Sequence, residues 1–193
     1  MLRIVLVRPG MTDYDQQGRI MGTLDVPLCQ EGCDTVAALV DQIQAYGMDL
    51  IYTSPSESAA QTADTLAAAL NVKTKVLSQL RNINHGLWQG MLIDDVKRKQ
   101  PKVYKMWQEQ PEAVCPPEGE MLSGARQRAE RAVIKLLKKH AAGTIGLVVP
   151  EPLASLLASI LRQTDLKNVW NHNHAAGSWE VIEIQPPALT TVS

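Results

Sequence analysis

The chain has 193 residues, of which 45% are hydrophobic, so it is long and apolar enough to bury one sizeable core. Its formal net charge of −1 provides no long-range attraction for nucleic acid or anionic lipid, which argues against both as partners. No apolar run approaches the ~18 residues of a membrane-spanning helix, which argues against a membrane protein.

The first part of the chain alternates apolar strands with amphipathic helices. Residues 4–7, Ile-Val-Leu-Val, predict a buried strand. Apolar side chains in residues 32–45 recur at three- and four-residue spacing, which predicts a helix that ends at Gly47. Residues 49–54 predict a second strand, and a stripe of Ala and Leu in residues 56–71 predicts a second helix.

The middle of the chain is more polar. Residues 74–80 predict a third strand. Residues 94–110 indicate a polar helical region that Pro101 bends or interrupts, because proline lacks the backbone N–H that a helix needs. Residues 120–140 predict a long helix, and its last turns are rich in Lys and His, as the helix dipole favours.

The last part of the chain returns to alternating apolar elements. Residues 144–149 predict a fourth strand, residues 153–163 a helix, and residues 179–184 an edge strand. The alternation along the chain favours an α/β fold, a three-layer α/β/α sandwich with a mostly parallel central sheet. We expect one domain over residues 1–185 and a loose tail over residues 186–193.

In a sheet of this kind the ligand crevice lies beyond the carboxyl ends of the strands. The strand exits expected here are residues 8–10, 54–58, 81–82 and 150–152. Side chains from these four exits are therefore the candidates for a shared site.

Five segments carry motifs in a fixed order. The first strand leads into Arg8-Pro9-Gly10-Met11-Thr12, followed by Gly-Arg, Gly-x-x-Asp-x-Pro-Leu and Gly within residues 18–32. Residues 59–63 read Ala-x-Gln-Thr-Ala, residues 80–90 end in Gly-x-Trp-x-Gly, and residues 116–121 form a Pro- and Gly-containing turn. Residues 146–157 run from an apolar strand through Pro150-Glu151-Pro152 into a helix. Together these motifs resemble the histidine phosphatase superfamily, in the branch with the cofactor-dependent phosphoglycerate mutases and their phosphatase relatives.

The resemblance implies a phosphoglycerate mutase-like fold and phosphoryl transfer through a phosphohistidine. In that chemistry one His is the nucleophile, a second His and two Arg bind the phosphoryl oxygens, and a carboxylic acid protonates the leaving group. In this sequence the positions of the nucleophile, the second His, the second Arg and the acid hold Pro9, Glu151, Ser58 and Asn82. Only Arg8 remains, and proline offers neither a nucleophilic side chain nor a backbone N–H.

These replacements lead us to expect a catalytically inactive member of the superfamily, with a binding, regulatory or scaffold role rather than an enzymatic one. Two alternatives stay open. One is altered chemistry in the same crevice, in which Glu151 with Asp13 or Asp15 forms a carboxylate pair or binds a divalent ion. The other is residual phosphatase or mutase activity, as the resemblance would imply.

The residues expected to contact a ligand are Arg8, Gly10, Thr12, Arg19 and His85. Arg8 is able to hold an anion through a bidentate contact, or to pair with Glu151 across the pocket, and we favour the ion pair. His85 follows Asn82 in the same loop, so the alternative for it is an exposed or capping loop residue.

Neither a metal nor a cofactor is expected. Three widely spread cysteines suggest reduced thiols in a cytoplasmic protein. His172 and His174 have a spacing that is able to chelate a metal, but no carboxylate or Cys lies near them in the sequence. A protein partner and a small anionic ligand both stay open, and the sequence does not indicate an oligomeric state.

Overall fold

The structure is a computed structural model of the whole chain, and it describes residues 1–164 and 175–184. The tail expected over residues 186–193 and the His172–His174 pair lie outside the described residues. The division of the chain into residues 1–185 and a tail therefore stays a prediction.

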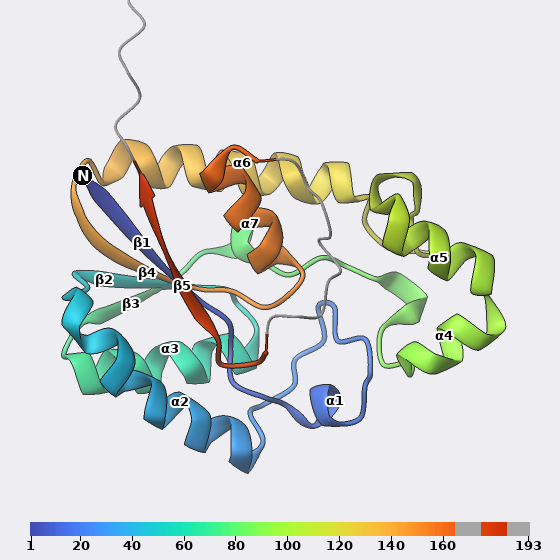
Figure 1. Cartoon of the computed structure of the whole chain (residues 1–193), viewed down its shortest axis with the longest axis horizontal. Helices are drawn as coiled ribbons and strands as arrows, with labels where there is room; N and C mark the ends of the chain where they lie inside the picture. The colour runs from blue at the N-terminus through green and yellow to red at the C-terminus, as the bar shows by residue number, and fades with distance from the viewer. Residues whose placement is uncertain (165–174, 185–193) are drawn as a thin grey trace, which may run out of the picture.

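A five-stranded sheet in the order β3-β2-β4-β1-β5 forms the centre of the molecule (Figure 1). The strands are β1 (Leu2–Val7), β2 (Leu50–Thr53), β3 (Lys73–Val76), β4 (Gly143–Val148) and β5 (Trp179–Ile184). All neighbours pair in parallel except β5, which runs antiparallel to β1 at the edge of the sheet. The predicted α/β fold with a mostly parallel sheet is confirmed.

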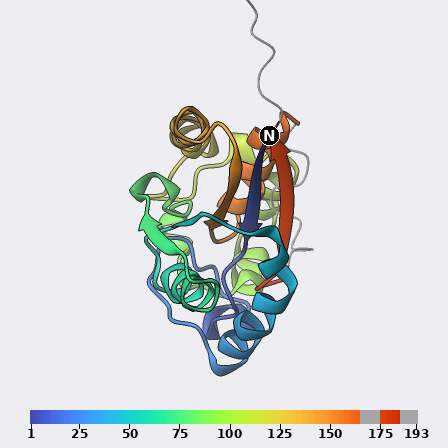
Figure 2. The same ribbon diagram turned by 90° about the vertical axis from the view of Figure 1, so that its left-hand side faces the viewer.

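Helices cover both faces of the sheet, so the molecule has three layers (Figure 2). The α-helices are α1 (Asp13–Gln16), α2 (Gln30–Ile43), α3 (Glu57–Leu70), α4 (Ile93–Lys99), α5 (Pro101–Glu109), α6 (Leu122–Lys139) and α7 (Leu153–Arg162). One apolar core joins α6 and α7 to the sheet, and a second joins α2 and α3 to its other face. Among the described residues, no helix is long and apolar enough to cross a membrane.

A third apolar cluster lies beyond the carboxyl ends of the strands, where α1, α4 and α5 project from the sandwich (Figure 1). Its buried members are Ile20, Trp88, Val96, Tyr104, Trp107 and Val114. This cluster forms a separate wall above the sheet edge, and the Trp88 side chain is buried in it.

Two elements differ from their prediction. The expected strand 74–80 is shorter, because after β3 the chain turns into a 3-10 helix, Ser78–Leu80. The expected helix 94–110 is divided into α4 and α5, because Pro101 begins a new helix with a residue that needs no backbone donor. The second difference agrees with the predicted effect of Pro101.

Candidate functional site

The exits of β1 and β4 lie side by side. Val7 and Val148, the last residues of these two strands, are partners in the parallel ladder. Because both strands point the same way, the residues that follow them meet at one edge of the sheet. Arg8 and Glu151 therefore come together although 143 residues separate them in sequence.

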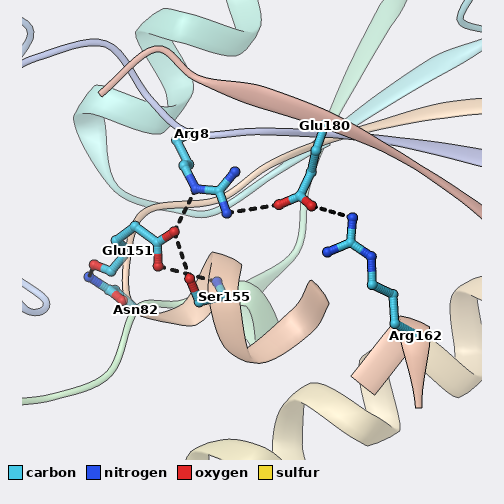
Figure 3. Close-up of polar contacts among 6 residues, drawn as sticks. All are labelled: Arg8, Asn82, Glu151, Ser155, Arg162 and Glu180. Carbon is cyan, nitrogen blue, oxygen red and sulfur yellow. Dashed lines mark hydrogen bonds and ion pairs between the residues drawn. The ribbon is translucent and has the colours of Figure 1, made fainter. Parts of the chain in front are cut away.

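Arg8 is held between two carboxylates (Figure 3). Its Nε donates to Oε1 of Glu151 at 2.5 Å, and its Nη2 donates to Oε1 of Glu180 at 2.8 Å. The Arg8 side chain is only 3% exposed, so these partners offset the cost of burying its charge. The predicted ion pair between Arg8 and Glu151 is present.

The two contacts leave Arg8 with further donors. A guanidinium has five N–H groups, and the contacts with Glu151 and Glu180 use two of them. The other N–H groups have no acceptor within the part of the chain that the structure describes. Arg8 is therefore able to donate to an anion while it keeps both carboxylate partners.

Glu180 links Arg8 to a second arginine. Its other oxygen accepts a hydrogen bond from Nη2 of Arg162, at the end of α7 (Figure 3). Burial alone would raise the pKa of Glu180, but the hydrogen bonds and charges of Arg8 and Arg162 lower it below its usual range. Glu180 thus stays ionised and fixes the orientation of the Arg8 guanidinium.

The Glu151 carboxylate lies at the first turn of α7. The backbone N–H of Ser155 donates to Oε2 at 3.2 Å, and the Ser155 hydroxyl donates to Oε1 at 2.9 Å. The positive end of the helix dipole adds to these contacts. Both oxygens of Glu151 are thereby oriented, while the side chain stays 30% exposed toward the cavity.

Asn82 fixes the backbone of the site rather than facing the cavity. Its Nδ2 donates to the carbonyl oxygens of Glu151 at 2.8 Å and of Gly22 at 3.0 Å. It is buried and does not line the cavity. Asn82 therefore holds together the loop after β1, the turn after β4 and its own loop.

A cavity of about 360 Å³ opens above these contacts. Among the residues singled out from the sequence, those that line it are Arg8, Pro9, Gly10, Thr12, Asp15, Arg19, Ser58, His85 and Glu151. The structure thus gathers all the expected ligand contacts around one space, and of the four positions predicted to be replaced only Asn82 does not line it. No contact pairs Asp15 with Glu151, because Oδ2 of Asp15 accepts from the backbone N–H and hydroxyl of Thr12.

Gly10 and Thr12 shape the cavity floor. A Cβ at Gly10 would lie 2.6 Å from the carbonyl oxygen of Gly32, so only glycine allows the loop to pass the start of α2 this closely. Thr12 caps α1 by accepting from the backbone N–H of Asp15. These contacts give both residues a structural role in addition to their place in the lining.

Arg19 and His85 stand on the walls. Arg19 donates to the side chain of Gln17 and to the carbonyl oxygen of Gly90, both at 2.7 Å. His85 is only 3% exposed, so the alternative of an exposed loop histidine is wrong. Burial lowers the pKa of His85 to about 4, against a smaller opposing effect of Glu120, so the ring is neutral near pH 7.

Sequence reasoning missed Glu180, Arg162 and Ser155. Glu180 lies on β5 opposite Leu6, a pairing that arises only when β5 adds antiparallel to β1. No local motif marks these residues, although Ser155 follows Glu151 by four residues, a helical spacing that suggests contact. Within the described ranges, no group of three His, Cys, Asp or Glu is placed to hold a metal ion.

The sequence profile of the Histidine phosphatase superfamily (branch 1) matches residues 4–193. The chain belongs to this superfamily. It is 28% identical over 186 residues to phosphoserine phosphatase 1 of Hydrogenobacter thermophilus, across 96% of this chain and 88% of that protein. It is 24% identical over 189 residues to the adenosylcobalamin/alpha-ribazole phosphatase of Escherichia coli, across 98% and 93%.

Solved structures of the superfamily share the fold. The mycobacterial glucosyl-3-phosphoglycerate phosphatase, in complex with VO3, matches with a TM-score of 0.85 at 24% identity. The match covers 93% of this chain and 90% of that one. The phosphoglycerate mutase-like architecture expected from the motifs therefore agrees with both comparisons.

The prediction of a catalytically inactive protein with a binding, regulatory or scaffold role is wrong. The similar superfamily members are named as phosphatases, and no comparison indicates inactivity. That prediction assumed that replacing the residues of one mechanism removes the activity. The cavity and the cationic Arg8 persist, so the alternative of residual phosphatase activity fits better.

Proposed function

We propose that the protein is a phosphatase that hydrolyses small phosphate monoesters in the cavity above Arg8. The observation that carries this proposal is the buried Arg8 guanidinium at the exit of β1, which lines the cavity and keeps N–H donors beyond those used by its carboxylate partners. Such a preorganised cation stabilises charge that develops on phosphoryl oxygens. The phosphatase names of the superfamily relatives support this class of reaction.

The attacking group in this proposal is water. Pro9 stands at the position that the resemblance assigns to the nucleophilic histidine, and its ring has no nucleophilic atom. Glu151 faces the same cavity with an oriented carboxylate, so it is the group to accept a proton from water. Glu151 is thereby the proposed general base of a single-step hydrolysis.

The proposed step balances without a further reactant. A water oxygen forms a bond to phosphorus, one water proton passes to the Glu151 carboxylate, and the ester P–O bond breaks. The leaving oxygen takes a proton from solvent, because Asn82 stands at the position that the resemblance assigns to the acid. Hydrolysis releases inorganic phosphate and an alcohol, and Glu151 returns its proton to solvent.

Phosphate release from purified protein tests the proposal. The substrates are benzyl, naphthyl and p-nitrophenyl phosphate together with phosphoserine, and we expect turnover of at least one of them. An Arg8→Gln or Glu151→Gln exchange is expected to lower kcat/KM by at least about 100-fold, since each removes a charge needed in the transition state.

Arg98→Gln is the matched control, because Arg98 is 76% exposed on α4 and lies outside the cavity. It is expected to keep the wild-type rate. No phosphate release from any ester, or equal rates for the Arg8 and Arg98 variants, would refute the proposal. The cytoplasmic location and a protein partner stay predictions from the sequence.

A further inference from the structure

The cavity lining has two chemically different parts. The floor at the sheet edge carries the charged pair of Arg8 and Glu151. Another part of the lining, the apolar wall, is formed by side chains from the loop after β1 and from α4 and α5. The apolar wall consists of Ile20, Met21, Ile93 and Trp107.

The apolar wall is backed by packed aromatic rings. The Trp107 side chain is 4% exposed, and its ring lies edge-on to His85 at 5.7 Å and to Trp88 at 5.6 Å between centroids. Edge-on aromatic packing of this kind holds ring orientations firmly. The wall therefore offers a preformed apolar surface, and the neutral His85 ring brings no positive charge to it near pH 7.

The other charged groups that line the cavity, Arg19 and Asp15, are not members of this apolar wall. Arg19 donates to Gln17 and to the Gly90 carbonyl, and Asp15 accepts from Thr12. A carboxylate or an ammonium on the alcohol part of a substrate that packs on the apolar wall would lie against side chains that carry no charge. Charged groups left unpaired in a partly buried site are costly.

The proposed reaction adds a second, independent argument. Because the leaving oxygen takes its proton from solvent, alcohols that leave as stable anions react faster. Phenols and naphthols are such alcohols, and they are flat, apolar and uncharged. The geometry of the wall and the chemistry of the floor thus favour the same kind of ester.

We infer that the alcohol part of the substrate is uncharged and aromatic, and that it packs on the wall formed by Ile20, Met21, Ile93 and Trp107. This inference rests on the proposed phosphatase function. It separates aryl and benzyl esters from charged esters such as phosphoserine or phosphoglycerate, whose charges would lie against side chains of the wall that carry none.

The first experiment compares kcat/KM for benzyl phosphate and phosphoserine. Benzyl alcohol is no better a leaving group than the serine hydroxyl, so a difference reports contact with the wall rather than leaving-group chemistry. We expect benzyl phosphate to be preferred by at least about tenfold, because the charges of phosphoserine find no partner among the side chains of the wall. An equal or higher kcat/KM for phosphoserine would overturn the inference and leave the phosphatase proposal intact.

A pair of variants locates the preference on the wall. Met21 lines the cavity and is partly exposed, so Met21→Lys introduces a cation there without opening a core. We expect it to lower the benzyl-to-phosphoserine preference about tenfold by pairing with the carboxylate. Met106→Lys is the matched control, because Met106 is 46% exposed on α5 outside the cavity, and it should keep the wild-type preference. Equal effects of the two exchanges would contradict a role for the wall.

Binding without turnover separates this inference from the proposed function. Calorimetry with benzylphosphonate and with the phosphonate analogue of phosphoserine measures affinity for compounds that cannot be hydrolysed. Tighter binding of benzylphosphonate supports the apolar wall even if no ester is turned over, in which case only the phosphatase proposal fails. Tighter binding of the phosphoserine analogue overturns the inference, whatever the catalytic result.

Discussion

At the scale of single residues, Arg8 shows how this site differs from a strongly cationic phosphate pocket. Its charge is compensated by Glu151 at 2.5 Å and Glu180 at 2.8 Å. The two carboxylates allow the Arg8 side chain to stay buried in the absence of a ligand. They also weaken the electrostatic field that attracts a phosphate. We therefore expect substrate recognition to depend on the alcohol part of the ester as well as on its phosphate.

His85 provides a prediction about pH and stability. Its pKa is about 4 in the folded protein and 6.5 when unperturbed, so the unfolded chain binds more protons between these values. The contribution of the neutral His85 ring to the free energy of unfolding is therefore complete above pH 6.5 and is lost as the pH falls toward 4. The free energy of unfolding should be lower by about 2 kcal/mol at pH 5 than at pH 7, measured by urea titration.

The control for this prediction is a comparison of two histidine variants. His85→Gln should remove most of the loss between pH 7 and pH 5, whatever its effect on absolute stability. His140→Gln should remove a smaller part of this loss, since the pKa of His140 is lowered by a shallower burial and by the charge of Lys139. A wild-type protein equally stable at both pH values would contradict the burial of a neutral His85.

At the scale of elements, the site depends on three loops that Arg128 and Asn82 hold in place. Arg128, on α6, donates to the carbonyl oxygens of Gln79, Arg81 and Asn82. It also forms an ion pair with Glu120. Burial alone would raise the pKa of Glu120, but the hydrogen bonds and the charge of Arg128 lower it below its usual range. The loop that carries Asn82 is thereby fixed to α6, and Asn82 in turn holds the backbone of Glu151.

Exchange of Asn82 tests this arrangement. Asn82→Asp removes the Nδ2 donor and points a carboxylate at two carbonyl oxygens, those of Gly22 and Glu151. We expect the free energy of unfolding to fall by about 2–4 kcal/mol, because buried acceptors lose their donor. We also expect a lower kcat/KM, since the backbone of Glu151 is no longer held.

Asn84→Asp is the matched control, because Oδ1 of Asn84 only accepts a hydrogen bond from Gly86, which a carboxylate accepts as well. Asn84→Asp should lower the free energy of unfolding by less than about 1 kcal/mol, measured by the same denaturant titration. Equal costs for the two exchanges would contradict the proposed role of Asn82.

At the scale of the whole molecule, the order of strands and helices follows from local patterns, and the meeting of their ends follows from parallel pairing. Periodicity predicted the strands, the main helices and the break at Pro101, because these depend on neighbours in sequence. The pairing of Arg8 with Glu151 was predicted from the resemblance. Glu180 and the wall around Trp107 were not, since both need contacts between distant segments that leave no local signal.

The prediction of function failed for a different reason. That prediction rested on Pro9 and Asn82, which stand at the positions that the resemblance assigns to the nucleophile and the acid, and these residues say nothing of a route through water. The superfamily relatives are phosphatases, and the cavity retains a cation and an oriented carboxylate. Fold and family thus indicate the reaction class, while the residues present decide how it is performed.

The stereochemical course at phosphorus tests the central claim most directly. Benzyl phosphorothioate, made chiral with oxygen isotopes, would be hydrolysed by the protein in isotopically labelled water, and the configuration of the released thiophosphate determined by NMR. A single attack by water, with Glu151 as base, predicts inversion of configuration. Retention would require two displacements through a phosphorylated residue and would contradict this account, as would the absence of any hydrolysis.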